Sequence, residues 1–273
     1  HGRYLIFLYI CIYNVYMHYI GHYSMNFKII QPPQLWPLFI TVISASTFLF
    51  ATVSNGAEKN SLVTEEQRTA KLHNVLIIGD SISMGYTSEV RKLLRGTANV
   101  HRSEVNNRDT RLGLKHLNEW LGQTQWDVIH FNWGLHDLCH RNPDSTAPGH
   151  RDKIHGSISV PIDEYKLNLE SLVLQLLSTE AVLIWANTTI VPQGEIGRIS
   201  GDELRYNRAA SDIMERYKIT TNDLFTLTSK LDKSLFKGPG DVHYTKDGYD
   251  VIAAQVSEHI RRVLAEGNFN DSK

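Results

Sequence analysis

Apolar runs and amphipathic stretches alternate along most of this chain. The apolar runs predict five strands, near residues 74–79, 98–102, 126–132, 181–188 and 218–222. Apolar residues at helical spacing predict helices near residues 85–95, 110–122, 162–178, 202–217 and 246–265. Alternation of this kind is typical of a parallel sheet with helices on both faces. We therefore expect one α/β domain over about residues 60–270.

The first predicted strand runs straight into Gly79, Asp80 and Ser81. Glycine permits the tight turn that must follow a buried strand, and a helical pattern begins soon afterwards. Ser81 is therefore expected at the carboxyl end of a strand and close to the start of a helix. Open α/β sheets bind their ligands at this edge, and a helix N-terminus stabilises a developing oxyanion. The alternative interpretation is an ordinary turn with a capping serine.

His243 stands just before the last predicted helix, and Asp241 precedes it by two residues. A serine hydroxyl is a weak nucleophile until an adjacent base takes its proton. A histidine at the edge of the sheet could serve as that base for Ser81, and an aspartate would then orient its ring. The two ends of the domain together therefore favour nucleophilic catalysis over a capping serine.

With these residues in place, the sequence resembles the SGNH (GDSL-type) hydrolase family over residues 72–266. The resemblance lies in four blocks: Ile78–Ser81, Asn106–Leu114, Phe131–Asp137, and His243 with the residues that follow it. It implies a three-layer α/β/α, flavodoxin-like fold with a central parallel sheet of about five strands. It also implies a serine esterase without cofactor or metal, in which Ser81 is the nucleophile, His243 the general base and Asp241 its orienting acid.

The oxyanion hole is where the blocks depart from the family pattern. The third block usually reads Gly-x-Asn-Asp, but His136 stands here in place of the asparagine. The side-chain donor is therefore either His136, since an imidazole can donate, or Asn132. The second block has Arg108 in place of the usual glycine, whose backbone N–H any residue but proline can replace. The backbone N–H of Ser81 would complete the hole.

The acid also departs from the family pattern, which is usually Asp-x-x-His. Gly240 stands three residues before His243, and Asp241 stands two before it. Either Asp241 reaches the ring along a different backbone path, or the enzyme works with a Ser–His dyad. We further expect Asp80, Asn107 and Gly134, within the matching blocks, to bind substrate. Thr188, after the fourth predicted strand, faces the same edge of the sheet and either binds substrate in the pocket or caps a turn.

A long connection over residues 139–160 follows the third predicted strand and contains three histidines, His140, His150 and His155. A loop of this length in a compact domain is usually functional or disordered. It leaves the edge of the sheet that carries Ser81, so it is either a substrate-covering loop or an ordinary solvated one. A metal site is a third interpretation, although the histidine spacings match no ligand motif.

Charge and cysteine content exclude other classes of protein. The formal net charge is −1 at pH 7 and no basic run is present, which excludes nucleic acid as a partner. The two cysteines are Cys11, in the N-terminal segment, and Cys139. An intrachain disulfide is therefore impossible once that segment is removed, and we expect Cys139 to be an idle thiol rather than a nucleophile.

Residues 29–57 contain no charged side chain, and Lys28 precedes them. A basic start, an apolar stretch and small residues near residue 57 predict a signal peptide over residues 25–57. The alternatives are an uncleaved membrane anchor, which would be the only contact with a membrane, and a buried helix. Residues 1–24 hold six of the twelve tyrosines and no acidic residue. We interpret them as upstream sequence read in frame, with Met25 as the start, or alternatively as a first membrane segment.

The sequence therefore predicts an exported serine esterase, periplasmic or extracellular, that cleaves a small-molecule or polysaccharide ester. The family resemblance and export favour acyl groups on carbohydrate. A lysophospholipase or short-chain esterase is the alternative among enzymes. A carbohydrate-binding module that kept the fold without turnover is the alternative of another class. The sequence leaves the oligomeric state open.

Overall fold

The computed structural model describes residues 72–267. Its central sheet has five parallel strands in the order β2-β1-β3-β6-β7, the flavodoxin-like arrangement. The strands are β1 (His73–Ile78), β2 (Ala98–Arg102), β3 (Val128–Phe131), β6 (Val182–Ala186) and β7 (Thr220–Asn222). The predicted parallel sheet is confirmed, and the ends of each strand differ from the prediction by two residues at most.

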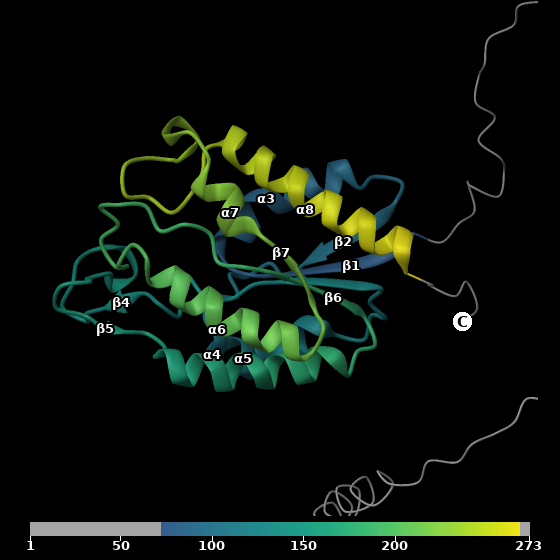
Figure 1. The fold of residues 1–273 in the computed structure, drawn as a ribbon, viewed down its shortest axis with the longest axis horizontal. Coiled ribbons are helices and arrows are strands. Elements are labelled where there is room, and N and C mark those ends of the chain that lie inside the picture. Colours follow the sequence, from purple (N-terminus) through teal and green to yellow (C-terminus); the bar gives the residue numbers. More distant parts are fainter. Residues whose placement is uncertain (1–71, 268–273) are drawn as a thin grey trace, which may run out of the picture. The chain divides into compact units, whose positions relative to one another are not determined.

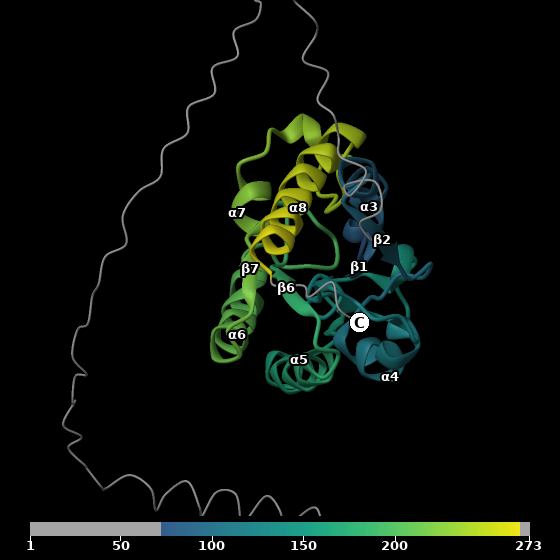
Figure 2. The ribbon, with the colours of Figure 1, turned by 90° about the vertical axis from the view of Figure 1, so that its right-hand side faces the viewer.

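Helices cover both faces of this sheet (Figures 1 and 2). One face carries α3 (Ser81–Leu93), α7 (Leu224–Ser229) and α8 (Lys246–Glu266), and the other carries α4 (Thr110–Leu121), α5 (Ile162–Leu177) and α6 (Asp202–Arg216). Apolar side chains of the strands and of the inner helix faces are fully buried between the layers, among them Val75, Ile129, Leu172, Ile184 and Ile252. Burial of each such side chain contributes about 1.5–3 kcal/mol to folding. The predicted three-layer α/β/α fold is confirmed.

Helix α3 begins at Ser81, four residues before the predicted start at residue 85, so that prediction was wrong. The Asp80 side chain caps the helix by accepting a hydrogen bond from the backbone N–H of Ile82 at 2.9 Å. Gly85 lies inside the helix because α8 packs closely here: a Cβ at Gly85 would lie 2.2 Å from the ring of Tyr249. The first turn also carries an apolar side chain, because Ile82 begins a buried stripe that continues with Tyr86 and Val90.

The connection over residues 139–160 is ordered and forms a small hairpin of β4 (His140–Arg141) and β5 (Ser157–Ile158), with the short 3-10 helix η1 (Pro148–His150) between them. Backbone hydrogen bonds from His140 to Gly197 (2.6 Å) and from Lys153 to Ile196 (2.9 Å) attach it to the segment after β6. The second 3-10 helix, η2 (Lys233–Leu235), lies before α8. Within residues 72–267, no three histidine, cysteine or acidic side chains are grouped as metal ligands would be.

The predictions for the N-terminal segment lie outside the described residues. They concern the upstream sequence over residues 1–24, the signal peptide or anchor over residues 25–57, and Cys11. Across residues 72–267, no helix combines the length and apolar character needed to cross a bilayer. Cys139 is a free, buried thiol.

Candidate active site

The segment that leads into α8 places His243 against Ser81 at the carboxyl edge of the sheet. Nε2 of His243 lies 2.8 Å from Oγ of Ser81, and Nδ1 lies 2.6 Å from Oδ1 of Asp241. About a third of the His243 and Asp241 side chains is exposed to solvent. The structure thus joins the three predicted catalytic residues in one hydrogen-bonded chain that solvent can reach, the arrangement of a nucleophile, its base and an orienting acid.

Close packing explains why the acid stands two residues before His243 and not three. Gly240 has a positive φ of 71°, and a Cβ there would lie 2.7 Å from the backbone of Gly194. An aspartate therefore does not fit at the usual position. Asp241 reaches the histidine instead by a tight turn, in which its Oδ1 accepts hydrogen bonds from both the backbone N–H (2.9 Å) and the ring of His243.

The ionisation of Asp241 suits this arrangement. Burial by itself raises the pKa of the Asp241 carboxyl, but the two hydrogen bonds from His243 outweigh it and the pKa lies below its usual value. The carboxylate is therefore charged at neutral pH. A charged acceptor at Nδ1 places the ring proton there and leaves Nε2 free to take the proton of Ser81.

The first turn of α3 offers a backbone donor at Ser81. Asp80 is 1% exposed, and its cap uses the N–H of Ile82, while no group among residues 72–267 accepts a hydrogen bond from the N–H of Ser81. That N–H is available to an oxyanion. Burial raises the pKa of Asp80 in spite of the hydrogen bond from Ile82. Asp80, which was predicted to bind substrate, is therefore buried, and its side chain caps the N-terminus of α3.

The second block contributes two of the predicted residues. Asn107 is fully buried and accepts a hydrogen bond from the N–H of Gly79 at 3.0 Å, so it fastens this loop to the turn before Ser81. Arg108 has a φ of 44°, in the left-handed region where glycine is favoured. This agrees with the glycine that the family pattern has here. The N–H of Arg108 is engaged by the exposed side chain of Asn106 at 2.9 Å, a bond that it must give up to hold an oxyanion.

The third block holds the two alternatives for the side-chain donor. Nδ2 of Asn132 donates to the carbonyl of Ala186 at 2.7 Å, which ties it to the end of β6. Nδ1 of His136 lies 3.2 Å from Nη2 of Arg141 and accepts from it, since a guanidinium only donates. Burial of the ring, with the charges of Arg198 and Arg141, lowers the pKa of His136 to about 3. A neutral ring that accepts at Nδ1 carries its proton on Nε2, so Nε2 of His136 is available as a donor, as is the second N–H of the Asn132 amide.

Comparisons with known proteins agree with this geometry at the level of the fold. No protein-family model matches the sequence, and no curated protein matches it either. Among solved structures, the chain is similar to the acetyl xylan esterase AlAXEase (TM-score 0.55, 13% identity, covering 68% of this chain and 99% of that one). It is also similar to a lipase/acylhydrolase from Enterococcus faecalis (TM-score 0.57, 16% identity, covering 71% of this chain and 96% of that one). A third similar structure is the acetylxylan esterase Axe2 from Geobacillus stearothermophilus (TM-score 0.54, 18% identity, covering 69% of this chain and 94% of that one). This chain has the SGNH hydrolase fold.

Within this SGNH fold, the last residue of the third block has a role that the sequence did not predict. Asp137 is fully buried, and its Oδ1 accepts hydrogen bonds from the N–H and the hydroxyl of Thr110, at 2.8 and 2.6 Å. It thus holds Thr110, the first residue of α4, which lies within the second block. Burial raises the pKa of Asp137 to about 8, although the bonds from Thr110 lower it. The only signal in the sequence is an acidic residue beside His136.

Gly134 and Thr188, both predicted to bind substrate, pack against each other. Thr188 is 1% exposed, and its backbone N–H and carbonyl are both paired with the side chain of Asn207, at 2.7 and 2.8 Å. A Cβ at Gly134 would lie 2.0 Å from Oγ1 of Thr188. The structure therefore brings these two residues together as the packed base of the site in the SGNH fold.

Gly134→Ala should lower the free energy of unfolding by about 1–3 kcal/mol, because the added methyl group overpacks the contact with Thr188. Urea unfolding of the full chain measures this. Thr188→Ala in the Gly134→Ala background should recover part of the loss, since it removes the closest atom, and a double-mutant cycle measures the coupling. Wild-type stability of the single variant would contradict the close contact.

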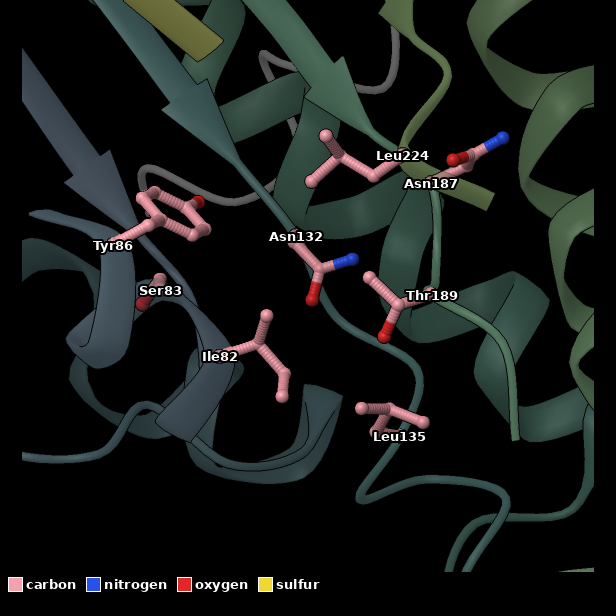
Figure 3. A pocket seen from close by; sticks show the side chains of 8 residues that line it. All are labelled: Ile82, Ser83, Tyr86, Asn132, Leu135, Asn187, Thr189 and Leu224. Atoms are coloured by element: carbon pink, nitrogen blue, oxygen red, sulfur yellow. The ribbon is translucent and has the colours of Figure 1, made fainter. Parts of the chain in front are cut away.

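Figure 3 shows a small cavity that is lined in part by Ile82 and Ser83, the residues after Ser81 in α3. Its walls come from α3, from the segments after β3 and β6, and from α7. The cavity has a volume of about 10 Å³, room for about one water molecule or a group of similar size. The lining residues are Ile82, Ser83, Tyr86, Asn132, Leu135, Asn187, Thr189 and Leu224.

Proposed function

We propose that this chain is a serine esterase. The observation that carries the proposal is the continuous hydrogen-bonded chain from Oγ of Ser81 through His243 to Asp241, at the edge of the sheet where α/β folds bind ligands. A different part of the structure positions each residue: the capped helix α3 positions Ser81, the segment before α8 positions His243, and a tight turn positions Asp241. A module that only binds carbohydrate has no need of this alignment, which favours turnover over the binding alternative.

The reaction follows from the arrangement. Oγ of Ser81 attacks the ester carbonyl while Nε2 of His243 takes its proton, and the Asp241 carboxylate stabilises the imidazolium that forms. The N–H of Ser81 and Nε2–H of His136 bind the oxyanion. The tetrahedral intermediate collapses, His243 returns the proton to the leaving alkoxide, and an alcohol departs from an acyl-enzyme. Water, deprotonated by His243, then attacks the acyl group and releases the acid and Ser81.

We propose acetyl groups on carbohydrate as the substrate class. We assign the acyl group to the cavity lined by Ile82 and Leu135, because Ile82 follows Ser81 directly in α3. This cavity has room for a group about the size of a methyl and not for a long acyl chain. Two of the similar structures are described as acetyl xylan esterases. The small cavity disfavours a lysophospholipase. We also propose export, on the basis of the apolar stretch within residues 25–57, which suits a polymer substrate outside the cell.

A fluorophosphonate probe and a series of p-nitrophenyl esters test this proposal. With the purified full chain we expect covalent labelling of Ser81, and a kcat/KM that falls at least about tenfold from acetyl to butyryl, because the extra methylenes have no space. Leu135→Ala, which widens the cavity, should reduce that ratio. Faster hydrolysis of octanoyl than acetyl esters would refute the small acyl group. Absence of both labelling and hydrolysis would favour the binding module.

A further inference from the structure

His136 lies at a meeting point of four segments at the edge of the sheet. The positive charges that act on its ring are those of Arg198, Arg141, Arg108 and protonated His243, in that order. They come from the segment after β6, from the β4–β5 hairpin, from the loop before α4 and from the segment before α8. Figure 1 shows the hairpin and the segment before α8 at the same end of the sheet. The ring is therefore surrounded by donors and cations, which disfavour its protonated form.

Arg141 on strand β4 is the one of these groups that touches the ring. Its Nη2 donates to Nδ1 of His136 at 3.2 Å. The rest of the guanidinium is held by the hairpin: Nε donates to Oγ of Ser159 at 3.1 Å, and Nη1 donates to the carbonyl of Gly149. Anchored at three points, this planar group has little freedom to turn away, so its donor stays directed at Nδ1.

A second buried network holds the backbone beside His136. Nε of Arg198 donates to the carbonyl of Leu135 at 2.6 Å. Glu195, fully buried, accepts from both Arg198 and Arg151 at 3.0 Å, and so ties this contact to the hairpin segment. Arg141 thus holds the ring of His136, and Arg198 holds the carbonyl of the residue before it. Neither arginine belongs to the third block.

We propose that Arg141 is a positioning residue that fixes the tautomer of His136, so that Nδ1 stays bare and Nε2 always carries the proton that is donated to the oxyanion. That His136 donates to an oxyanion rests on the proposed esterase function. The assignment of its tautomer is independent of that function. A guanidinium has only donors, so it excludes a proton on Nδ1 and excludes the imidazolium as well. An asparagine amide, usual in this block, has fixed donors and needs no such partner. The β4–β5 hairpin, through Arg141, supplies the partner that a histidine needs to hold one tautomer.

Nitrogen NMR of the histidine rings tests the tautomer without any substrate. In the full chain labelled with 15N-histidine, and with the signals assigned by their loss in His136→Gln, His136 should show a protonated Nε2 and a bare Nδ1. This state should persist from about pH 5.5 to 8. Arg141→Met should produce a mixture of tautomers or a titration in this range. Arg205→Met, which removes an exposed guanidinium of α6 that pairs with Asp202 and does not touch the ring, should leave the His136 signals unchanged.

Kinetics with p-nitrophenyl acetate test the consequence. Arg141→Met should lower kcat about tenfold or more with little change in KM, because the lost donor acts on the transition state, and Arg141→Lys should recover part of it. A wild-type His136 protonated on Nδ1, or titrating near pH 6.5, overturns the proposal even if Arg141→Met fails to fold. Unchanged ring signals in Arg141→Met overturn it too. The expected ring state in a chain without esterase activity would refute the esterase and support the tautomer assignment.

Discussion

Ser81→Ala should abolish hydrolysis of p-nitrophenyl acetate, with kcat lower by roughly 10⁴- to 10⁶-fold. The variant loses the Oγ that lies 2.8 Å from Nε2 of His243, and with it the acyl-enzyme route. Folding should be unaffected, because Asp80 caps α3 through Ile82 and not through the Ser81 side chain. Initial rates, with a circular dichroism melting curve, measure both effects.

Ser88→Ala is the matched control for this prediction. Ser88 is exposed and lies on the same helix, so its loss tests a general effect of removing a hydroxyl from α3. It should keep wild-type turnover and remain labelled by the fluorophosphonate at Ser81. Near-wild-type turnover of Ser81→Ala would mean that another group is the nucleophile and that the mechanism is wrong.

Asp241→Asn should lower kcat at least about a hundredfold with little change in KM. The carboxylate accepts from Nδ1 of His243 at 2.6 Å, whereas an amide can donate there and so stabilise the wrong tautomer. The loss should appear in kcat because the bond strengthens only as His243 takes the proton from Ser81. Steady-state kinetics over several acetyl ester concentrations separate the two constants.

Asp232→Asn is the matched control, since Asp232 accepts a backbone hydrogen bond from Ser234 in the segment before α8 but does not touch His243. It should retain wild-type kinetics. His243→Ala should be inactive under either a triad or a dyad. Full activity of Asp241→Asn, beside an inactive His243→Ala, would establish a Ser–His dyad. A loss of less than about tenfold, about 1.4 kcal/mol, would also count against the triad.

The sequence by itself determined the layers of the fold and the pairing of Ser81 with His243. Strand and helix positions follow from local apolar periodicity, and buried parallel strands such as β1 and β3 are nearly continuous apolar runs. The place of Ser81 follows too, because a glycine after a buried strand and a helix behind it leave the chain few paths. The layers and the place of Ser81 depend on residues close together in the chain, so they could be read from the sequence. The pairing of Ser81 with His243, which are 162 residues apart, was predicted from the motifs at the two ends of the domain.

Only the tertiary structure explained two departures from the family pattern, at Gly240 and at His136. Asp241 stands where it does because the backbone of Gly194 leaves no room for a side chain at Gly240. The tautomer of His136 depends on Arg141, which binds its Nδ1 from a hairpin that the apolar pattern did not predict, and Asn132 is tied to β6. Each of these contacts joins segments that are distant in the chain or placed by a turn. Local periodicity carries no information about such contacts, which arise only when the layers pack.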